Sequence, residues 1–475
     1  MVETETHVIQ IAVVGHTNAG KTSLLRTLTR QASFGEVADR PGTTRHVERI
    51  ALRVDGASPV VFYDTPGLED STALLDYLQG LGQNTARLER VQAFLAGPEA
   101  RQSFEQEAKV LRKMLEVDAA LYVIDCREPV LPKFRCEIEI LASCARPVMP
   151  VLNFVRHGAS REAEWQAVLS ASGLHAQVRF DAVAPFIGSE QQLYHDLATL
   201  LPRQREVLAG VVYYLDREAA ERRAASCRLM AELLVDLAAL RRPIAPEAFT
   251  DVTQRRQFVA DVQALALARV RLCMDGLLQV YGFRREEADV AALPWLDGRW
   301  QDDLFNPETL KQAGKRLGQG AAIGASLGLI ADIAVAGVSL GAGAVVGGAV
   351  GGMVTQGWRQ FGHKLVNKIR GVQELTLENE LLLVVATHLL GVQRALAQRG
   401  HAAAQKIVVG GEKAVASDAA LRQLVTLAQP ARSHPRWERR AGERGAESSQ
   451  RRALVDTLAE RLAALTDAAH IPARP

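Results

Sequence analysis

A glycine-rich run near the start of the chain has the residue types and spacing of a phosphate-binding loop. It reads Gly15-His16-Thr17-Asn18-Ala19-Gly20-Lys21-Thr22-Ser23, fits G-x-x-x-x-G-K-[ST], and follows a β-branched run at 9–14. In such a loop, backbone N–H groups point at phosphate oxygens, and the next helix adds its positive N-terminal end. Lys21 would neutralise phosphate charge, and the Thr22 hydroxyl would be placed to bind Mg²⁺. The residues predicted to contact a nucleotide here are Gly15, Asn18, Ala19, Gly20, Lys21, Thr22 and Ser23.

Two further motifs follow in an order that suits phosphoryl transfer. The apolar run 60–63 ends in Asp64-Thr65-Pro66-Gly67, where an acid can hold a Mg²⁺-bound water and the Gly67 N–H can sense a γ-phosphate. Between this motif and the glycine-rich run lies a loop at 40–45, Arg-Pro-Gly-Thr-Thr-Arg. One of its threonines, Thr43 or Thr44, could complete the Mg²⁺ shell. The alternative for this loop is a surface Pro-Gly turn.

These three motifs resemble those of the small-GTPase-like family of translation and RNA-modification factors typified by Era and TrmE. The resemblance covers about residues 8–200. It implies binding of GTP and GDP, hydrolysis of GTP, and Mg²⁺ bound by Thr22, Thr44 and Asp64. The second threonine of a T-T-R loop is the family's ligand, which favours Thr44 and leaves Thr43 as the other candidate. Lys21, Thr44 and Gly67 are then the expected catalytic residues.

The sequence departs from relatives of this type at the position that orients the attacking water. Leu68 stands where Ras-like enzymes carry a glutamine, so hydrolysis is expected to be slow. Asn18 matches an asparagine that helps TrmE-like members bind K⁺ beside the phosphates, which predicts stimulation by K⁺. The alternative for Asn18 is that it only braces the loop.

The base-recognition motif N-K-x-D is matched only in part. Asn153 is present and is predicted to contact the nucleotide, but Arg156 replaces the terminal acid and cannot accept a hydrogen bond. The motif therefore leaves two alternatives, a site selective for GTP and a site that also accepts ATP. Asp181, at the end of the next strand, is a candidate substitute acid, and an ordinary strand-end turn is the alternative.

Hydrophobic periodicity predicts a three-layer α/β domain over 1–202, with helices on both faces of a mostly parallel sheet. Its strands are predicted at 8–14, 60–63, 119–124, 147–154 and 177–182. Residues 69–116 are more than a minimal domain needs, and they predict an enlarged switch region of two helices broken near Gly97-Pro98. This insertion is either a nucleotide-dependent surface or a static addition.

Beyond 202 the helical spacing of Leu, Val and Ala predicts a mainly α-helical region. We divide it into a helical domain at 203–316, a glycine-rich segment at 317–358, and a C-terminal region at 359–475. The last of these contains predicted helices at 372–396, 414–427 and 451–464, and a polar linker at 430–450.

The glycine-rich segment is unlike the rest of the chain. It holds 12 of the 37 glycines and one formal charge, Asp332, between Lys315-Arg316 and Arg359. Its 42 residues are long enough for a helical hairpin that turns near Asp332, with both ends on the cytoplasmic side. Glycines four apart let another helix approach closely. Membrane contact is the favoured hypothesis, and a buried soluble hairpin is the alternative.

Composition limits the partners. With 56 Lys+Arg against 54 Asp+Glu, the chain has no global basic field for nucleic acid, and no nucleic-acid module is evident. Five cysteines without a CxxC pair predict a reducing, cytoplasm-facing compartment, and residues 1–6 do not resemble a secretory signal. The expected location is cytoplasmic, peripheral to the membrane face or inserted there as a hairpin. The protein partner is unknown from sequence.

Two hypotheses for function remain. The first is a GTPase whose nucleotide state controls a helical, membrane-associated effector region. The second is a membrane-associated structural or interaction protein that binds nucleotide with little hydrolysis or without guanine selectivity.

Overall fold

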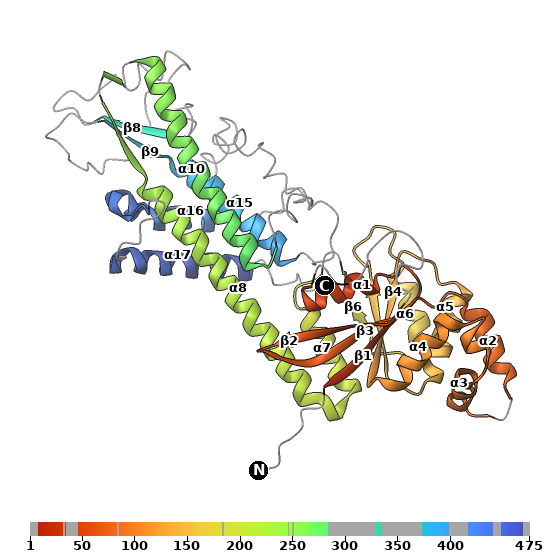
Figure 1. The fold of residues 1–475 in the computed structure, drawn as a ribbon. Helices are drawn as coiled ribbons and strands as arrows, with labels where there is room; N and C mark the ends of the chain where they lie inside the picture. Colours follow the sequence, from red (N-terminus) through yellow and green to blue (C-terminus); the bar gives the residue numbers. More distant parts are fainter. Residues whose placement is uncertain are drawn as a thin grey trace, which may run out of the picture. The chain divides into compact units, whose positions relative to one another are not determined.

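The computed structural model describes residues 8–31, 34, 46–82, 85–182, 185–245, 247–248, 251–283, 329–333, 373–398, 417–439 and 448–468. The chain divides into two compact units (Figure 1). The N-terminal unit contains Met1–Ala220 and Gln398–Gln405, and the C-terminal unit contains Glu221–Ala397 and Lys406–Pro475.

The N-terminal unit is built on a six-stranded sheet in the order β2-β3-β1-β4-β5-β6. All neighbouring strands are parallel except β2, which pairs antiparallel with β3. The strands are β1 (Ile9–Val14), β2 (Glu48–Val54), β3 (Ala57–Asp64), β4 (Ala119–Asp125), β5 (Val148–Asn153) and β6 (Val178–Arg179). This confirms the predicted mostly parallel sheet.

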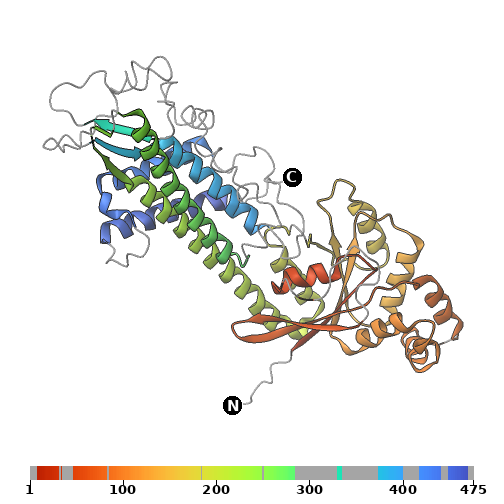
Figure 2. The ribbon, with the colours of Figure 1, turned by 45° about the horizontal axis from the view of Figure 1, so that its top comes forward.

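Helices cover both faces of this sheet and make the predicted three layers (Figure 2). One face packs against α1 (Lys21–Thr29), α7 (Ser189–Leu200) and the first turns of α8 (Arg205–Ala239). The other face packs against the inserted helices, α5 (Pro132–Ser143) and α6 (Glu162–Ala171). Because β1 and β4 are nearly fully buried on both faces, their sequences are continuous apolar runs.

The predicted strands lie close to the observed ones, but β2 was not predicted. Its residues Glu48, Arg49 and Arg53 are exposed, so the sequence lacks a continuous apolar run. Charged residues of this kind are typical of an edge strand. The last predicted strand, at 177–182, is only two residues long in β6.

The insertion at 69–116 contains three α-helices rather than the predicted two. They are α2 (Ser71–Gly80), α3 (Arg87–Ala96) and α4 (Glu105–Glu116), with a short 3-10 turn at Glu99–Arg101. The predicted break at Gly97 is confirmed, since it ends α3. The additional break follows Gly80, and Gly82 has a left-handed φ of 141°.

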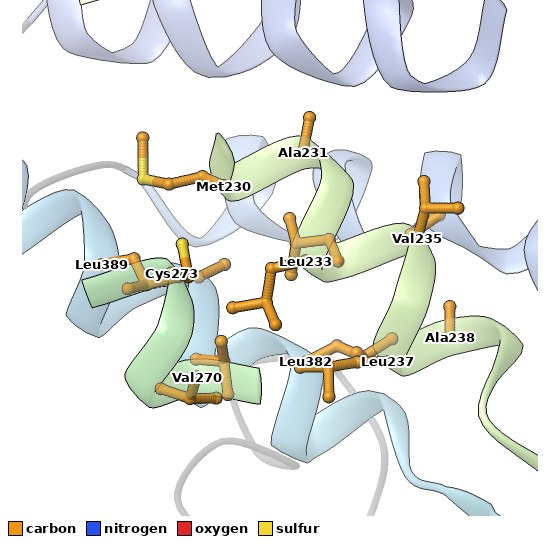
Figure 3. Packing of buried hydrophobic residues seen from close by; sticks show 14 of the residues in the cluster. Met230, Ala231, Leu233, Val235, Leu237, Ala238, Val270, Cys273, Leu382 and Leu389 are labelled. Atoms are coloured by element: carbon orange, nitrogen blue, oxygen red, sulfur yellow. The ribbon is translucent and has the colours of Figure 1, made fainter. Parts of the chain in front are cut away.

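The C-terminal unit is mainly helical around one apolar core. The core joins the second part of α8 to α10 (Val252–Val280), α15 (Asn379–Ala397), α16 (Asp418–Ala428) and α17 (Ser449–Ala468). Figure 3 shows Leu233 and Leu237 of α8 near Val270 of α10 and Leu382 of α15. The two units divide inside α8, after Ala220, because its first turns belong to the core of the N-terminal unit.

A small antiparallel sheet in the C-terminal unit was not predicted. Its order is β7-β9-β8, with β7 at Arg241–Ile244, β8 at Leu329–Ile333 and β9 at Gln373–Leu377. The expectation of a helix from 372 is therefore wrong for β9. These three short strands are far apart in sequence, so local periodicity does not reveal their pairing.

The same sheet corrects part of the proposed hairpin at 317–358. Residues Leu329–Ile333 form strand β8, and Asp332 pairs with Glu374 of β9 rather than lying at a turn between helices. Pairing with β9 overrides the helical reading of this short stretch. The rest of 317–358 lies outside the described residues.

The predicted polar linker at 430–450 is partly incorporated into the folded unit. Short 3-10 helices occupy Gln429–Ser433 and Pro435–Trp437, and Trp437 is buried. The buried Glu438 carboxylate accepts hydrogen bonds from Arg242 at 2.6 and 2.7 Å and from Arg269 at 2.5 Å. These charge-assisted bonds fix the segment, although its composition is that of a surface loop.

Among the described residues, one helix is long and apolar enough to cross a membrane. This is α15, with a mean hydropathy of 1.4 over its best window, of which 67% is buried inside the protein. Its residues Leu382, Val385 and Leu389 belong to the core of the C-terminal unit. The apolar character of α15 is thus accounted for by that core.

A buried carboxyl group marks the start of α15. Glu378 is 6% exposed and its Oε2 has no hydrogen-bond partner. Burial raises the pKa of Glu378 to about 8, with the Glu380 charge adding to this shift and Arg432 opposing it. In an unfolded chain a glutamate titrates near 4.3. Between about pH 4.5 and 8 the unfolded state therefore releases a proton that the folded state keeps.

We expect the free energy of unfolding to fall as the pH rises from 5 to 8, and Glu378→Gln to reduce this fall because the amide stays neutral. The difference in melting temperature between Glu378→Gln and wild type should be at least about 2 °C more favourable to the variant at pH 8 than at pH 5. Thermal unfolding followed by circular dichroism measures both. Glu460→Gln, at an exposed position of α17, is the control. Equal pH dependence in Glu378→Gln and wild type would contradict the assignment.

Candidate nucleotide-binding site

Strand register brings the predicted site residues to one edge of the sheet. Val13 of β1 lies opposite Asp64 of β3, and Asp125 of β4 lies opposite Asn153 of β5. The parallel strands therefore end side by side, and the loop at 15–20 leaves the sheet between Asp64 and Asn153. Crevices at the carboxyl ends of such strands are the usual ligand sites of open α/β sheets.

The loop at 15–20 has the backbone of a phosphate-binding loop. Gly20 has a φ of 91° and leads directly into α1, whose first N–H groups face the loop. A Cβ on Gly20 would lie 2.4 Å from Nδ2 of Asn153. Both this backbone conformation and this close approach require glycine at 20. Asn18, in the same loop, also has a left-handed φ, of 65°, and is exposed.

Lys21 is held in place by the loop itself. Its Nζ donates to the carbonyl oxygens of Gly15 at 3.2 Å and His16 at 3.0 Å. Burial lowers the pKa of Lys21, while the nearby carboxylates of Asp64 and Glu137 raise it. A buried ammonium group from the first residue of α1 is suited to bind an anionic phosphate.

Asp64 and Thr22 form the candidate Mg²⁺ site. The Thr22 hydroxyl donates to Oδ2 of Asp64 at 2.5 Å, and both residues are buried. Oδ1 of Asp64 is buried without a hydrogen-bond partner. Burial raises the pKa of Asp64, while the Thr22 hydroxyl and the Lys21 charge lower it. A hydroxyl and an unsatisfied carboxylate oxygen are oxygen ligands of the kind that Mg²⁺ takes, so these residues fit the ion.

The Asp-Thr-Pro-Gly turn packs directly on the phosphate loop. Thr65 donates its hydroxyl to the carbonyl oxygen of Val13 at 2.8 Å. A Cβ on Gly67 would lie 2.7 Å from the backbone nitrogen of Thr17, so only glycine fits. The N–H of Leu68 donates to the Gly15 carbonyl at 3.4 Å. Gly67 is thus placed beside the loop that would carry the phosphates.

The base side of the site is organised by Asn153. Its Nδ2 donates to the Ala19 carbonyl at 3.0 Å, and its Oδ1 accepts the N–H of Ala182 at 3.0 Å. Asn153 therefore joins the phosphate loop to the loop after β6. Phe154, in the motif position of the lysine, has a left-handed φ of 57° and carries the Arg127 guanidinium 3.9 Å from its ring centre.

Arg156 and Asp181 lie near one another on this side. The Arg156 guanidinium is 4.3 Å from the ring centre of Phe186. Burial lowers the pKa of Arg156, and the Asp181 charge raises it. Asp181 is 5% exposed. The carboxylate on this side thus comes from Asp181, whereas the N-K-x-D pattern places one at 156.

The insertion braces the turn that follows Gly67. Glu107 of α4 is buried, and its Oε1 accepts the N–H groups of Glu69 at 3.2 Å and Asp70 at 3.1 Å. Asp70 in turn caps α2 by accepting the N–H of Ala73 at 3.1 Å. The insertion is therefore in direct contact with the segment that would respond to the γ-phosphate.

The structure assembles most of the predicted site, while Thr43 and Thr44 lie outside the described residues. The residues that it brings together are Gly15, Asn18, Ala19, Gly20, Lys21, Thr22, Ser23, Asp64, Gly67 and Asn153. Three further residues that contact this site, His16, Glu107 and Glu137, were not predicted from the sequence. Helical spacing offered a signal for Glu137, because it shares the apolar face of α5 with Phe134 and Leu141.

The parallel sheet, the phosphate loop and the Asp-Thr-Pro-Gly turn define the N-terminal unit as a bacterial P-loop GTPase domain. A family model described as "50S ribosome-binding GTPase" matches residues 10–154. A second, described as "Domain of unknown function (DUF3482)", matches residues 166–460. Because this second match covers more than half of the chain, the protein belongs to the DUF3482 family.

Similar proteins match parts of the chain. A probable GTP-binding protein EngB of Acidovorax ebreus is 42% identical over 58 residues, which are 12% of this chain and 27% of that protein. The tRNA modification GTPase MnmE of Beijerinckia indica is 27% identical over 224 residues, which are 47% of this chain and 41% of that protein. The chain thus spans less than half the length of either relative.

Solved structures also match. Aquifex aeolicus Era bound to GDP and AlF4⁻ has a TM-score of 0.28 and 16% identity, covering 47% of this chain and 67% of that chain. A probable GTP-binding protein engB has a TM-score of 0.27 and 15% identity, covering 41% of this chain and 99% of that chain.

We expect Glu107→Ala to loosen the turn after Gly67, because two backbone N–H groups lose their acceptor. Hydrogen exchange of the amides of Glu69 and Asp70, measured by mass spectrometry, should become about tenfold faster. Glu105→Ala is the matched control, since Glu105 lies on the same helix and pairs with Lys109 at the surface. If both variants exchange this segment at the wild-type rate, Glu107 does not brace the turn.

Proposed function

We propose that the protein binds GTP and GDP with Mg²⁺, hydrolyses GTP slowly, and uses its nucleotide state to control the C-terminal unit. The observation that carries the proposal is the buried group of Lys21, Thr22 and Asp64, with an unsatisfied Asp64 oxygen, at the start of α1. Helix α8 has residues in both units and is the candidate element for such control.

The proposed division of labour follows from the contacts. The loop N–H groups and Lys21 bind the phosphates, and Asn153 holds the loop toward the base. Thr22 and Asp64, together with Thr44, would hold Mg²⁺. When bound, Mg²⁺ supplies positive charge that neutralises the phosphate oxygens. The Gly67 N–H contacts the γ-phosphate and thereby reports its presence.

The proposed slow rate rests on the absence of a water-orienting side chain at Leu68, which is fully buried. A K⁺ ion near Asn18 would supply charge that an arginine finger supplies elsewhere. Asn18 is exposed at the loop, which leaves its side chain accessible to such an ion. Its left-handed φ is equally consistent with a bracing role.

A second candidate function is nucleotide binding with little hydrolysis or without guanine selectivity, in a structural or interaction protein. It is favoured by Leu68 at the water-orienting position and by Arg156 at the base-reading position. Asp181 beside Arg156 supports guanine binding instead, because its carboxylate could accept from the base. Measurement of turnover and base preference separates the two functions.

We expect the wild-type protein to release phosphate from GTP faster than from ATP, and faster in KCl than in NaCl. Lys21→Ala should lose at least about a hundredfold in rate because the phosphate charge is left unpaired, and Thr44→Ala should lose a similar factor if it completes the Mg²⁺ shell. A phosphate-release assay with purified full-length protein measures all of these rates.

Asn18→Ala is the control for the ion effect and should abolish the difference between K⁺ and Na⁺. Tight GTP binding by wild type, with a phosphate-release rate no higher than that of Lys21→Ala, would favour the second function. Equal turnover in KCl and NaCl would exclude stimulation by K⁺ but would not contradict the proposed hydrolysis of GTP.

We also propose that the segment at 317–358 contacts the cytoplasmic face of a membrane. Support comes from its single charge over 42 residues and from the flanking Lys315-Arg316 and Arg359. Strand β8 occupies Leu329–Ile333, so we assign the contact to the parts of the segment on either side of it.

We expect wild-type protein to float with anionic liposomes, and a double variant, Val345→Asp with Val346→Asp, to float at least about threefold less. Two charges in the apolar run oppose its burial in lipid. Val345→Ala with Val346→Ala is the matched control and leaves β8 intact. Absence of wild-type flotation would contradict membrane contact.

A further inference from the structure

His16 makes a set of contacts that the phosphate-loop motif does not require. Its Nδ1 lies 2.9 Å from the Leu68 carbonyl oxygen and 2.9 Å from Oε1 of Glu137. Its Nε2 lies 2.9 Å from Nζ of Lys133. The ring also meets the edge of Phe134, with centroids 5.4 Å apart. The side chain therefore lies against α5, which supplies Lys133, Phe134 and Glu137.

These partners determine the tautomer of His16. A carbonyl oxygen only accepts, so Nδ1 must carry the proton that it donates to Leu68. A lysine ammonium only donates, so Nε2 must be the bare nitrogen that accepts from Lys133. The Nδ1–H of His16 is thus directed at Leu68 and Glu137. Lys133 and Glu137 lie four residues apart on α5, and hence on one face.

Glu137 is itself fixed from the other side. It is fully buried, and its Oε2 accepts the hydroxyl of Tyr122 in β4 at 2.9 Å. Burial, with the Glu137 charge adding to it, raises the pKa of Tyr122 well above its ordinary value, so the hydroxyl remains a neutral donor. A buried carboxylate is retained at a cost unless hydrogen bonds compensate it, and both of its oxygens are bonded here.

The same network reaches the phosphate site through the main chain. Both main-chain groups of Leu68 are held by the loop, because its N–H donates to the Gly15 carbonyl and its carbonyl accepts from His16. The carbonyls of Gly15 and His16 are also the acceptors for Nζ of Lys21. Gly67, immediately before Leu68, packs on Thr17.

We propose that His16 is a positioning residue which, held by Glu137 and Lys133, fixes Leu68 and so aligns the Gly67 N–H for the γ-phosphate. The network thereby gives the site its preference for nucleoside triphosphate over diphosphate. This inference rests on the proposed function. A nucleoside diphosphate keeps the contacts with the loop and Lys21 but has no γ-phosphate to bind the Gly67 N–H. Loss of His16 therefore weakens binding of the triphosphate more than binding of the diphosphate.

The test compares dissociation constants of GDP and a non-hydrolysable GTP analogue, in Mg²⁺, for full-length wild type, His16→Ala, His16→Asn and His16→Gln. His16→Ala should weaken the analogue about tenfold and GDP less than about threefold. The amide nitrogen of Asn takes the place of Nδ1, whereas that of Gln reaches the place of Nε2. His16→Asn should therefore recover most of the selectivity, and His16→Gln should not.

Lys133→Met removes the donor to Nε2 from a partly exposed position and should weaken the analogue about threefold with an unchanged melting temperature. Equal weakening of both nucleotides in His16→Ala, or Asn as defective as Gln, would reduce His16 to a packing role and overturn the inference. If Lys133→Met and His16→Gln each keep the wild-type ratio of analogue to GDP affinity, the inference is also overturned. If the wild-type protein binds neither the GTP analogue nor GDP, the proposed function is overturned instead, and this inference with it.

Discussion

The parallel pairing of β1 with β3 is the constraint on which the site depends. It places Asp64 opposite Val13, so that the chain leaving β1 must turn beside the carboxylate at the end of β3. The Thr22 hydroxyl then reaches Asp64 from the first turn of α1. The pairing of β4 with β5 positions Asn153 in the same way on the other side of the loop. The register of the sheet thus places Asp64 and Asn153 on two sides of the phosphate loop, where they bond Thr22 and Ala19.

The turn after Asp64 is held by side chains from two sides. Glu107 of the insertion binds the N–H groups that follow Leu68, and His16 binds the Leu68 carbonyl. Buried carboxylates behind each contact, Glu107 and Glu137, are stabilised by hydrogen bonds rather than by solvent. The turn is therefore bonded directly to α4 of the insertion through Glu107 and, through His16, to Glu137 of α5.

The C-terminal unit combines an apolar helical core with buried ion pairs between distant segments. Glu438 joins Arg242 and Arg269, and Arg451 donates to Asp236 at 2.8 Å. Such pairs contribute little net stability after desolvation, but loss of one partner leaves a buried charge. They join segments far apart in the chain, and those of Glu438 bond the stretch with the composition of a linker to β7 and α10.

Sequence alone determined the phosphate loop, the Asp-Thr-Pro-Gly turn and the alternation of strands and helices in the N-terminal unit. These features depend on residues within a few positions of one another, so short-range spacing encodes them. Only the tertiary structure decided the contacts of His16 with Glu137, the bracing by Glu107, and the small sheet that contains β9, because each joins groups far apart in the chain. Local periodicity indicates which side chains are buried but not which distant segments or groups they meet, because those contacts form only when the layers pack together.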